Sequence, residues 1–289
     1  MAVYDDIIFS VAKEADKHLA EKLQADVLYY NGPVSMQCFS WFRETVEKMA
    51  SCADKKAGIA VFLTTGGGQA EAAEKFVDIL RHNYGEVYFV VPVAAMSAGT
   101  ILCMAGDKIY MDYSSSLGPI DPQIPDKEGK RYIPALGYLA KIDELIAKAN
   151  KGNLTAPEFQ WLLQQDLGFL SFCEEGRALA VDLLKKWLVK YKFKNWVCHR
   201  THNKGEAVSE AEKKNRAEEI ATLLSDHAHW HSHGRMIGLD ILRGECCLEI
   251  DDYGADKELQ GYIRRYNDTL SDYVARMQAP AFIYAVKAA

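Results

Sequence analysis

The chain has 289 residues, 49% of them apolar, so it can bury a sizeable core as one large domain with an appendage or as two modest domains. Its net charge of −6 excludes the strongly basic footprint of a nucleic-acid binder, and no apolar run reaches the roughly 18 residues of a membrane span. The seven cysteines form no CxxC pair, and the first residues lack the basic start and apolar centre of a signal peptide. These features predict a cytoplasmic protein in a reducing compartment.

The first third of the chain alternates helical and strand patterns. Its strand segments are apolar on both faces, which is typical of a largely parallel sheet covered by helices on both sides. Turn residues such as Asn31-Gly32-Pro33 separate these segments. We expect helices at 5–23, 36–50, 70–82 and 97–105, and strands at 26–30, 58–65, 87–93 and 108–111.

After Gly118 the pattern becomes mostly helical. We expect helices at 134–151, 155–193 and 209–229, with a break at Gly168, then a helical turn at 237–242, a strand at 246–250 and a terminal helix at 255–277. This predicts an α/β core made of residues 1–133 and 230–254, an inserted helical segment at 134–229, and a C-terminal helix and tail at 255–289.

Three glycines, Gly66 to Gly68, follow the strand at 58–65 and precede the helix at 70–82. Free backbone N–H groups point outward at such a helix amino end, so the turn can hold an oxyanion. A nucleotide phosphate loop is the competing interpretation, but neither GxxxxGK[ST] nor GxGxxG is present. A purely structural glycine turn is the other alternative.

Ser97 lies at the carboxyl end of the strand at 87–93 and opens a short helix among small neighbours. Its hydroxyl would stand exposed at the sheet edge, and the helix amino end favours developing negative charge. An isolated serine here would be read as a helix N-cap. The glycine turn nearby favours a nucleophile instead.

The glycine turn and the serine together resemble the ClpP peptidase clan, and Gly68 and Ser97 are 29 positions apart, close to the spacing of that clan. The segments SSSLGPIDPQ at 114–123 and HSHGRMI at 231–237 are similar to the serine dehydrogenase proteinase family, a distant relative of ClpP. The resemblance implies a ClpP/crotonase-like spiral of ββα units, with an oxyanion hole made by the N–H groups of Gly68 and Ala98.

A serine hydroxyl needs a base to take its proton. The family order of serine, aspartate and histidine carries over to Ser97, Asp121 and His233, with His231 as the near competitor. Asp121 can also be read as an Asp-Pro turn residue. A serine–lysine dyad of the kind used by the related SppA peptidases would need a buried lysine. Lys141 and Lys148 share one helix face, but the flanking Asp143 and Glu144 favour a solvated ion pair.

The run from 226 to 233 carries four histidines at alternate positions, which in an extended chain would share one side. HxH spacing alone is a weak indication of zinc, so we expect one histidine to act as a base and predict neither a metal nor a cofactor.

The function predicted is a serine peptidase-like hydrolase that cleaves peptide or protein substrates through an acyl-enzyme on Ser97. The alternatives are a catalytically weak ClpP-fold binding or assembly module, and a crotonase-type acyl-CoA enzyme. The clan resemblance also implies a homo-oligomer, with the apolar tail at 280–286 as a candidate interface.

Overall fold

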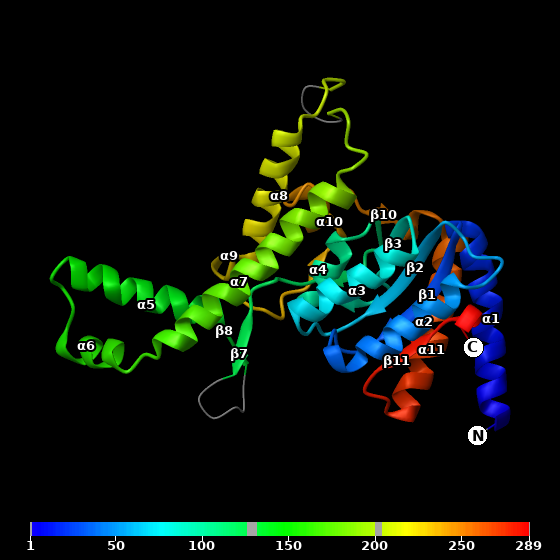
Figure 1. The fold of residues 1–289 in the computed structure, drawn as a ribbon, viewed down its shortest axis with the longest axis horizontal. Helices are drawn as coiled ribbons and strands as arrows, with labels where there is room; N and C mark the ends of the chain where they lie inside the picture. The colour runs from blue at the N-terminus through cyan, green and yellow to red at the C-terminus, as the bar shows by residue number, and fades with distance from the viewer. Residues whose placement is uncertain (1, 126–131, 200–203, 289) are drawn as a thin grey trace.

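The computed structural model describes residues 2–125, 132–199 and 204–288 and is built around a six-stranded sheet (Figure 1). The strand order is β10-β5-β3-β2-β1-β11, and each neighbouring pair is parallel except β1 and β11. The mixed α/β class with a mostly parallel sheet is therefore confirmed. The strands are β1 Ala25–Asn31, β2 Gly58–Thr64, β3 Glu86–Val90, β5 Lys108–Met111, β10 Asp251–Asp252 and β11 Phe282–Tyr284.

Helices cover both faces of this sheet because successive strand residues point to opposite sides. On β1, Leu28 and Tyr30 belong to the core beneath α2, α3 and α4, whereas Val27 and Tyr29 belong to the core beneath α1 and α11. The helices are α1 Ala2–Leu23, α2 Phe39–Ala50, α3 Ala70–Asn83, α4 Ala98–Met104 and α11 Lys257–Met277. Among the described helices, none is both long and apolar enough to cross a bilayer.

A second, three-stranded sheet sits beside the first and has the order β4-β6-β9. Its strands are β4 Ala94–Ala95, β6 Ser116–Leu117 and β9 Ile237–Gly238. β4 and β6 are parallel, and β9 is antiparallel to β6, so Ala95, Leu117 and Ile237 lie side by side. This small sheet brings together segments that are more than a hundred residues apart in the chain.

The segment between β6 and β9 is mainly helical, as expected, and it projects from the body in Figure 1. The predicted long helix at 155–193 is interrupted at Asp166, which caps α7, and not at Gly168, which lies inside α7. The elements are β7 Gln123–Pro125, β8 Tyr132–Pro134, α5 Ala135–Asn150, α6 Ala156–Leu163, α7 Leu167–Trp187, a π-helical turn Leu188–Lys192, α8 Glu210–Ser225, α9 His227–Trp230 and α10 Leu239–Gly244.

The later half of α7 and the inner face of α8 pack into the same apolar core as α2, α3 and α4. We keep as a proposal the division into a core at 1–133 and 230–254, a helical segment at 134–229 and a terminal part at 255–289. Only the outer part of the helical segment stands away from the body (Figure 1).

One expectation near the carboxyl end differs from the structure. The residues 246–250 show strand-like burial at alternate positions but pair with no strand among the described residues, because Cys247 turns the chain with a φ of 52°. The strand follows instead at Asp251–Asp252. The apolar tail forms β11, which pairs with β1 of its own chain and buries Ile283.

Candidate active site

Ser97 immediately precedes α4 and occupies a strained backbone position, with φ 51° and ψ −114°. L-residues other than glycine rarely adopt positive φ, and such strain recurs at catalytic positions. The side chain is partly exposed, and its hydroxyl has no hydrogen-bond partner among the described residues. Ser97 is therefore not acting as a side-chain N-cap, which was the alternative interpretation.

The glycine turn lies directly against this serine. A Cβ placed on Gly67 would approach the Cβ of Ser97 to 2.8 Å and the amide nitrogen of Ala98 to 3.5 Å. Gly67 and Gly68 have φ values of 107° and 150°, a conformation suited to glycine. Hydrogen bonds from the Val34 N–H to Gly67 and from the Gln69 N–H to Val34 hold the turn on the neighbouring loop.

The two N–H groups expected to form the oxyanion hole belong to Gly68 and Ala98. Neither donates a hydrogen bond to any acceptor within the described part of the chain. Ala98 is the first residue of α4, where a helix leaves its amide hydrogens unpaired. Both donors are consequently free for a ligand.

The three predicted catalytic residues lie beyond the same end of the strands in the small β4-β6-β9 sheet. Ser97 follows β4 by two residues, Asp121 follows β6 by four, and His233 precedes the antiparallel β9 by four. Because β9 runs opposite to the other two strands, all three residues extend from the same end of the sheet. The sheet thus places residues far apart in sequence at one end of its strands, and Asp121 and His233 are in direct contact there.

Asp121 is fully buried and accepts a hydrogen bond from Nδ1 of His233 at 2.8 Å. Its other oxygen accepts from Nε2 of Gln123 at 3.1 Å. A buried carboxylate can only accept hydrogen bonds when ionised, so the proton of a neutral His233 resides on Nδ1 and Nε2 is left as an acceptor. This is the tautomer that a general base requires.

A second imidazole that the sequence did not single out also faces Asp121. Nδ1 of His227 lies 3.7 Å from Oδ2 of Asp121 and is buried without a hydrogen-bond partner in the described structure. Asp226 caps α9 by accepting the His229 N–H at 3.1 Å, and this turn directs His227 inward. An N-cap aspartate before the histidine run was the sequence feature that could have revealed it.

Thr100 fastens the serine helix to the loop that carries Asp121. Its buried hydroxyl lies 2.9 Å from the carbonyl oxygens of both Ala95 and Gly118. The same hydroxyl accepts a hydrogen bond from the Gly118 N–H at 2.9 Å. Gly118 itself abuts Met96, where a Cβ would come within 2.6 Å of the methionine Cε. The aspartate loop therefore passes directly beside the residue that precedes Ser97.

The remaining candidate bases lie elsewhere. His231 is exposed, with a left-handed φ of 61°. Lys141 is exposed and bonded to Glu144 at 2.8 Å, and hydrogen bonds to Glu158 and Glu144 raise the pKa of Lys148, opposite to what a lysine base needs.

The histidine run is not extended, because it forms α9 followed by the turn at His231. Across residues 2–125, 132–199 and 204–288, no group of three metal-ligating side chains is arranged around a common centre.

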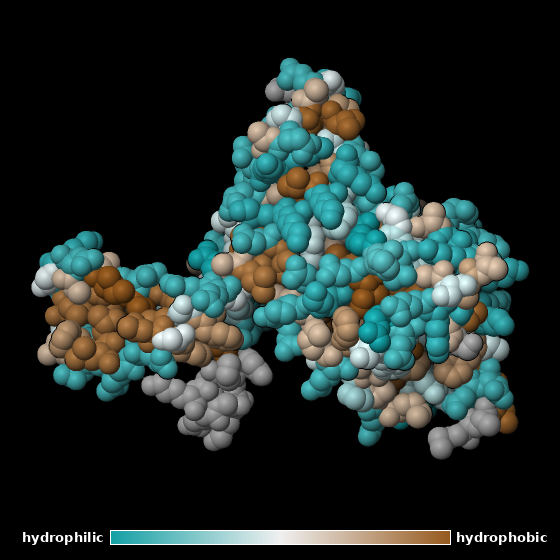
Figure 2. Space-filling model, viewed as in Figure 1, coloured by the Kyte–Doolittle hydropathy of each residue, from teal (hydrophilic) through white to brown (hydrophobic). Residues whose placement is uncertain are grey.

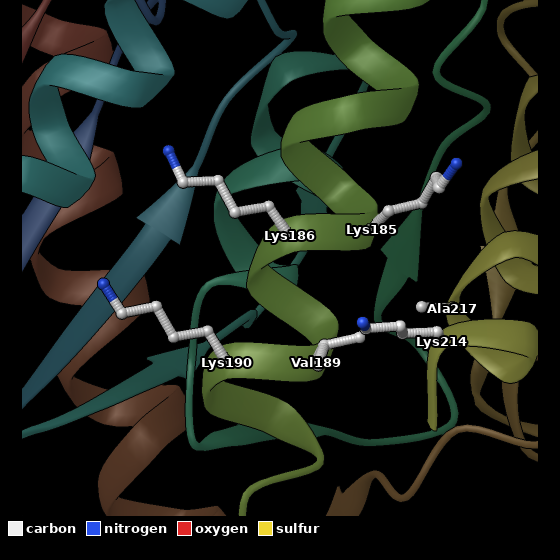
Figure 3. A pocket seen from close by; sticks show the side chains of 6 residues that line it. All are labelled: Lys185, Lys186, Val189, Lys190, Lys214 and Ala217. Carbon is white, nitrogen blue, oxygen red and sulfur yellow. The ribbon is translucent and has the colours of Figure 1, made fainter. Parts of the chain in front are cut away.

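A separate cavity of about 260 Å³ lies between α7 and α8 (Figure 3). Val189 and Ala217 line it together with four lysines, and Lys185 and Lys186 point away from each other. Lys185 pairs with Glu218, so these charges do not converge on one point. The cavity shares no residue with the constellation around Ser97.

The family match agrees with the resemblance expected from the motifs. Residues 43–140 match the family described as ClpP-like SDH-type serine proteinase, a stretch that includes the glycine turn, Ser97 and Asp121 and ends before His233. An uncharacterized protein of Methanocaldococcus jannaschii is 37% identical over 81 residues, 28% of this chain and 28% of that protein. A second one from this organism is 36% identical over 66 residues, 23% of each chain. The chain thus spans less than a third of either relative.

Among solved structures, the 1510-N membrane-bound stomatin-specific protease in complex with a substrate peptide is 22% identical, with a TM-score of 0.34 over 44% of this chain and 61% of that one. A probable enoyl-CoA hydratase/isomerase from Mycobacterium abscessus is 13% identical, with a TM-score of 0.28 over 66% of this chain and 80% of that one.

Proposed function

We propose that this chain, whose residues 43–140 match the ClpP-like SDH-type serine proteinase family, is a serine hydrolase that cleaves peptide bonds through an acyl-enzyme on Ser97. The observation that carries the proposal is the 2.8 Å hydrogen bond between His233 and the buried carboxylate of Asp121, on the sheet that also carries Ser97. This hydrogen bond orients His233 and gives it the tautomer that a general base needs, at the end of the sheet where the Ser97 hydroxyl lies.

In the proposed reaction, Nε2 of His233 takes the proton of the Ser97 hydroxyl as Oγ attacks the substrate carbonyl carbon. The carbonyl oxygen becomes an oxyanion held by the N–H groups of Gly68 and Ala98. His233 then delivers the same proton to the leaving amine, the carbon–nitrogen bond breaks, and an acyl-enzyme remains. A water molecule activated in the same way hydrolyses the ester and restores the serine.

The structure shows no hydrogen bond from the Ser97 hydroxyl to His233, since this hydroxyl has no hydrogen-bond partner among the described residues. Catalytic hydrogen bonds often shorten only when substrate binds, and substrate binding is expected to close this one. The unpartnered Ser97 hydroxyl also favours a second candidate, a catalytically weak ClpP-fold protein that acts as a binding or assembly module.

His227 gives the proposed base a neighbour with the same chemistry. His233 takes one oxygen of Asp121, and His227 faces the other. We assign His233 as the base because only its Nδ1 is within hydrogen-bond distance of the carboxylate. His227 stays a positioning residue that fills the other side of Asp121.

We also propose the cytoplasm as the compartment of this activity. All seven cysteines lie among the described residues, and none is in a disulfide. Cys103 and Cys246 are buried in apolar surroundings that raise the pKa of both thiols, that of Cys246 to about 12. They behave as packing residues of a reduced chain.

The experiment is labelling with a fluorophosphonate probe, with the adduct located by mass spectrometry. The wild type should be labelled at Ser97, and both Ser97→Ala and His233→Ala should abolish the adduct. His231→Ala is the matched control, because this histidine belongs to the same run but is exposed. His227→Ala should label more slowly than wild type and faster than His233→Ala.

Absence of labelling in a folded wild-type sample would favour the binding module. An adduct that survives His233→Ala but disappears in His227→Ala would transfer the role of base to the second imidazole.

A further inference from the structure

The cavity between α7 and α8 combines an apolar floor with a positively charged rim, and we call it the lysine cavity (Figure 3). Figure 2 shows the surface around α7 and α8 as mostly hydrophilic with small apolar patches. None of the described residues that line the cavity is acidic, so its lining carries one sign of charge. The lining consists of Lys185, Lys186, Val189, Lys190, Lys214 and Ala217.

The floor of the lysine cavity is a fixed part of the fold, and its rim is open to solvent. Ala217 is fully buried, and Val189 packs against the large core beneath α2, α3 and α4. Lys186, Lys190 and Lys214 are exposed. A partner can therefore reach the apolar floor without displacing either helix.

The lysines near the end of α7 fall into a structural group and an unpaired group. Lys194 pairs with the largely buried carboxylate of Asp107 at 2.5 Å, and Nζ of Lys192 lies 3.5 Å from the Asp107 carbonyl oxygen. These two lysines fasten the π-helical turn to the body. In the described part of the chain, neither Lys190 nor Lys214 forms an ion pair, so both ammonium groups are available to a partner.

The other two lysines of the rim are held weakly. Lys185 pairs with Glu218, and Lys186 lies 3.6 Å from Glu74. Ion pairs between exposed side chains contribute little to stability, so these lysines can also turn to a new anion at small cost. The two glutamates at the edge repel a dense polyanion, and the net charge of −6 does the same. A nucleic acid would also gain nothing from the apolar floor.

The spacing of the lysines selects an elongated partner. Lys186 and Lys190 extend in the same direction from successive turns of α7 (Figure 3), about 6 Å apart along the helix axis. A compact anion needs donors that converge on one centre, whereas carboxylates at positions i and i+4 of a helix have this same spacing. A volume of about 260 Å³ lies below the range of sites for drug-sized ligands and suits a few anchoring side chains.

We propose that the lysine cavity docks an acidic amphipathic helix of another protein. Its carboxylates pair with Lys186, Lys190 and Lys214, and its apolar side chains cover Val189 and Ala217. This interaction does not depend on the proposed reaction, since the cavity shares no residue with the constellation around Ser97.

The test is fluorescence anisotropy of the full chain with a short labelled helical peptide that carries glutamates one turn apart and leucines between them. The wild type should bind this peptide, and the affinity should fall as the salt concentration rises. Lys190→Glu together with Lys214→Glu should weaken binding at least about tenfold, because each substitution replaces an attraction with a repulsion. Lys13→Glu together with Lys17→Glu is the matched control. It makes the same change of charge at exposed positions of α1, on the other face of the main sheet, and should leave the affinity unchanged.

Two peptide variants complete the experiment. Glutamine in place of every glutamate should weaken binding to the wild type at least about tenfold, and a photoreactive leucine should form crosslinks to α7 or α8 that mass spectrometry locates. No binding to the wild type, equal affinity for the two peptides, crosslinks confined to other elements, or loss of binding in the α1 control would each overturn the proposal. Tighter binding of a single-stranded DNA oligonucleotide, abolished by the Lys190 and Lys214 substitutions, would assign the cavity to nucleic acid and overturn it as well.

Discussion

Asp16 should make the folded protein less stable as the pH rises through neutrality. This aspartate of α1 is only 9% exposed, and burial, followed by the nearby charge of Asp26, raises its pKa to about 7. Its Oδ1 and the hydroxyl of Tyr266 are both buried without hydrogen-bond partners in the described structure. The nearby Tyr266, Lys287 and Lys56 lower this pKa by less than burial and Asp26 raise it, so ionisation of Asp16 places a charge where burial is only partly compensated.

The sign and size follow from proton linkage. Because the folded-state pKa of Asp16 lies above the ordinary value of 3.8, the folded chain binds more protons than the unfolded chain between these two values, and raising the pH favours unfolding. Integrating this difference gives a loss of about 2.5 kcal/mol between about pH 5 and pH 8. Asp16→Asn replaces the titrating carboxyl with a neutral amide, so the variant should lack this pH-dependent loss of stability.

The assay is urea unfolding of wild type and Asp16→Asn across that pH range, and the free-energy difference between them should grow with pH in favour of the variant. Asp112→Asn is the control. Burial alone would raise the pKa of Asp112, but hydrogen bonds from Ser114, Gln260 and Arg264 lower it to about 2. The contribution of Asp112 to the free energy of unfolding is therefore constant over the pH range tested. A difference between Asp16→Asn and wild type that does not vary with pH would refute the reasoning.

Two further predictions concern the serine turn and the carboxyl-terminal tail. Gly67→Ala should slow labelling of Ser97 at least about tenfold, since the new methyl group adds about 1–3 kcal/mol of strain at this turn, whereas Gly66→Ala, which meets no atom within 4 Å, should label normally. Lys287→Met should lower the free energy of unfolding by about 3–5 kcal/mol in urea titrations, because it leaves the fully buried carboxylate of Asp26 without its cation at 2.9 Å. A loss below about 1 kcal/mol, the range of exposed pairs, would contradict the second prediction.

The α/β part could be predicted from sequence because local patterns determine it. The apolar run at 58–65 and the glycines after it became β2 and the turn, and the strand expected at 108–111 was found with those bounds. The strand expected at 246–250 was not found, because alternate burial also occurs in an extended segment that has no neighbouring strand to pair with. Pairing partners are a tertiary property that periodicity does not contain.

The candidate site was predictable only in part, for a similar reason. Ser97 and the glycine turn are local features that adjacent strands bring together. The expected partnership of Asp121 and His233 came from family resemblance, and the structure places the two side chains in hydrogen-bond contact while their catalytic role remains proposed. His227 escaped notice because the break between α8 and α9 depends on how Asp226 caps the chain.

The order in which the β4-β6-β9 strands occur along the chain bears on events during synthesis. β4 and β6 emerge from the ribosome early, but β9 ends at Gly238, after α7 and α8 have been made. Until then, a nascent chain holds the serine and the aspartate but has no place for His233. The proposed nucleophile therefore has no place for its proposed base until β9 has been synthesised.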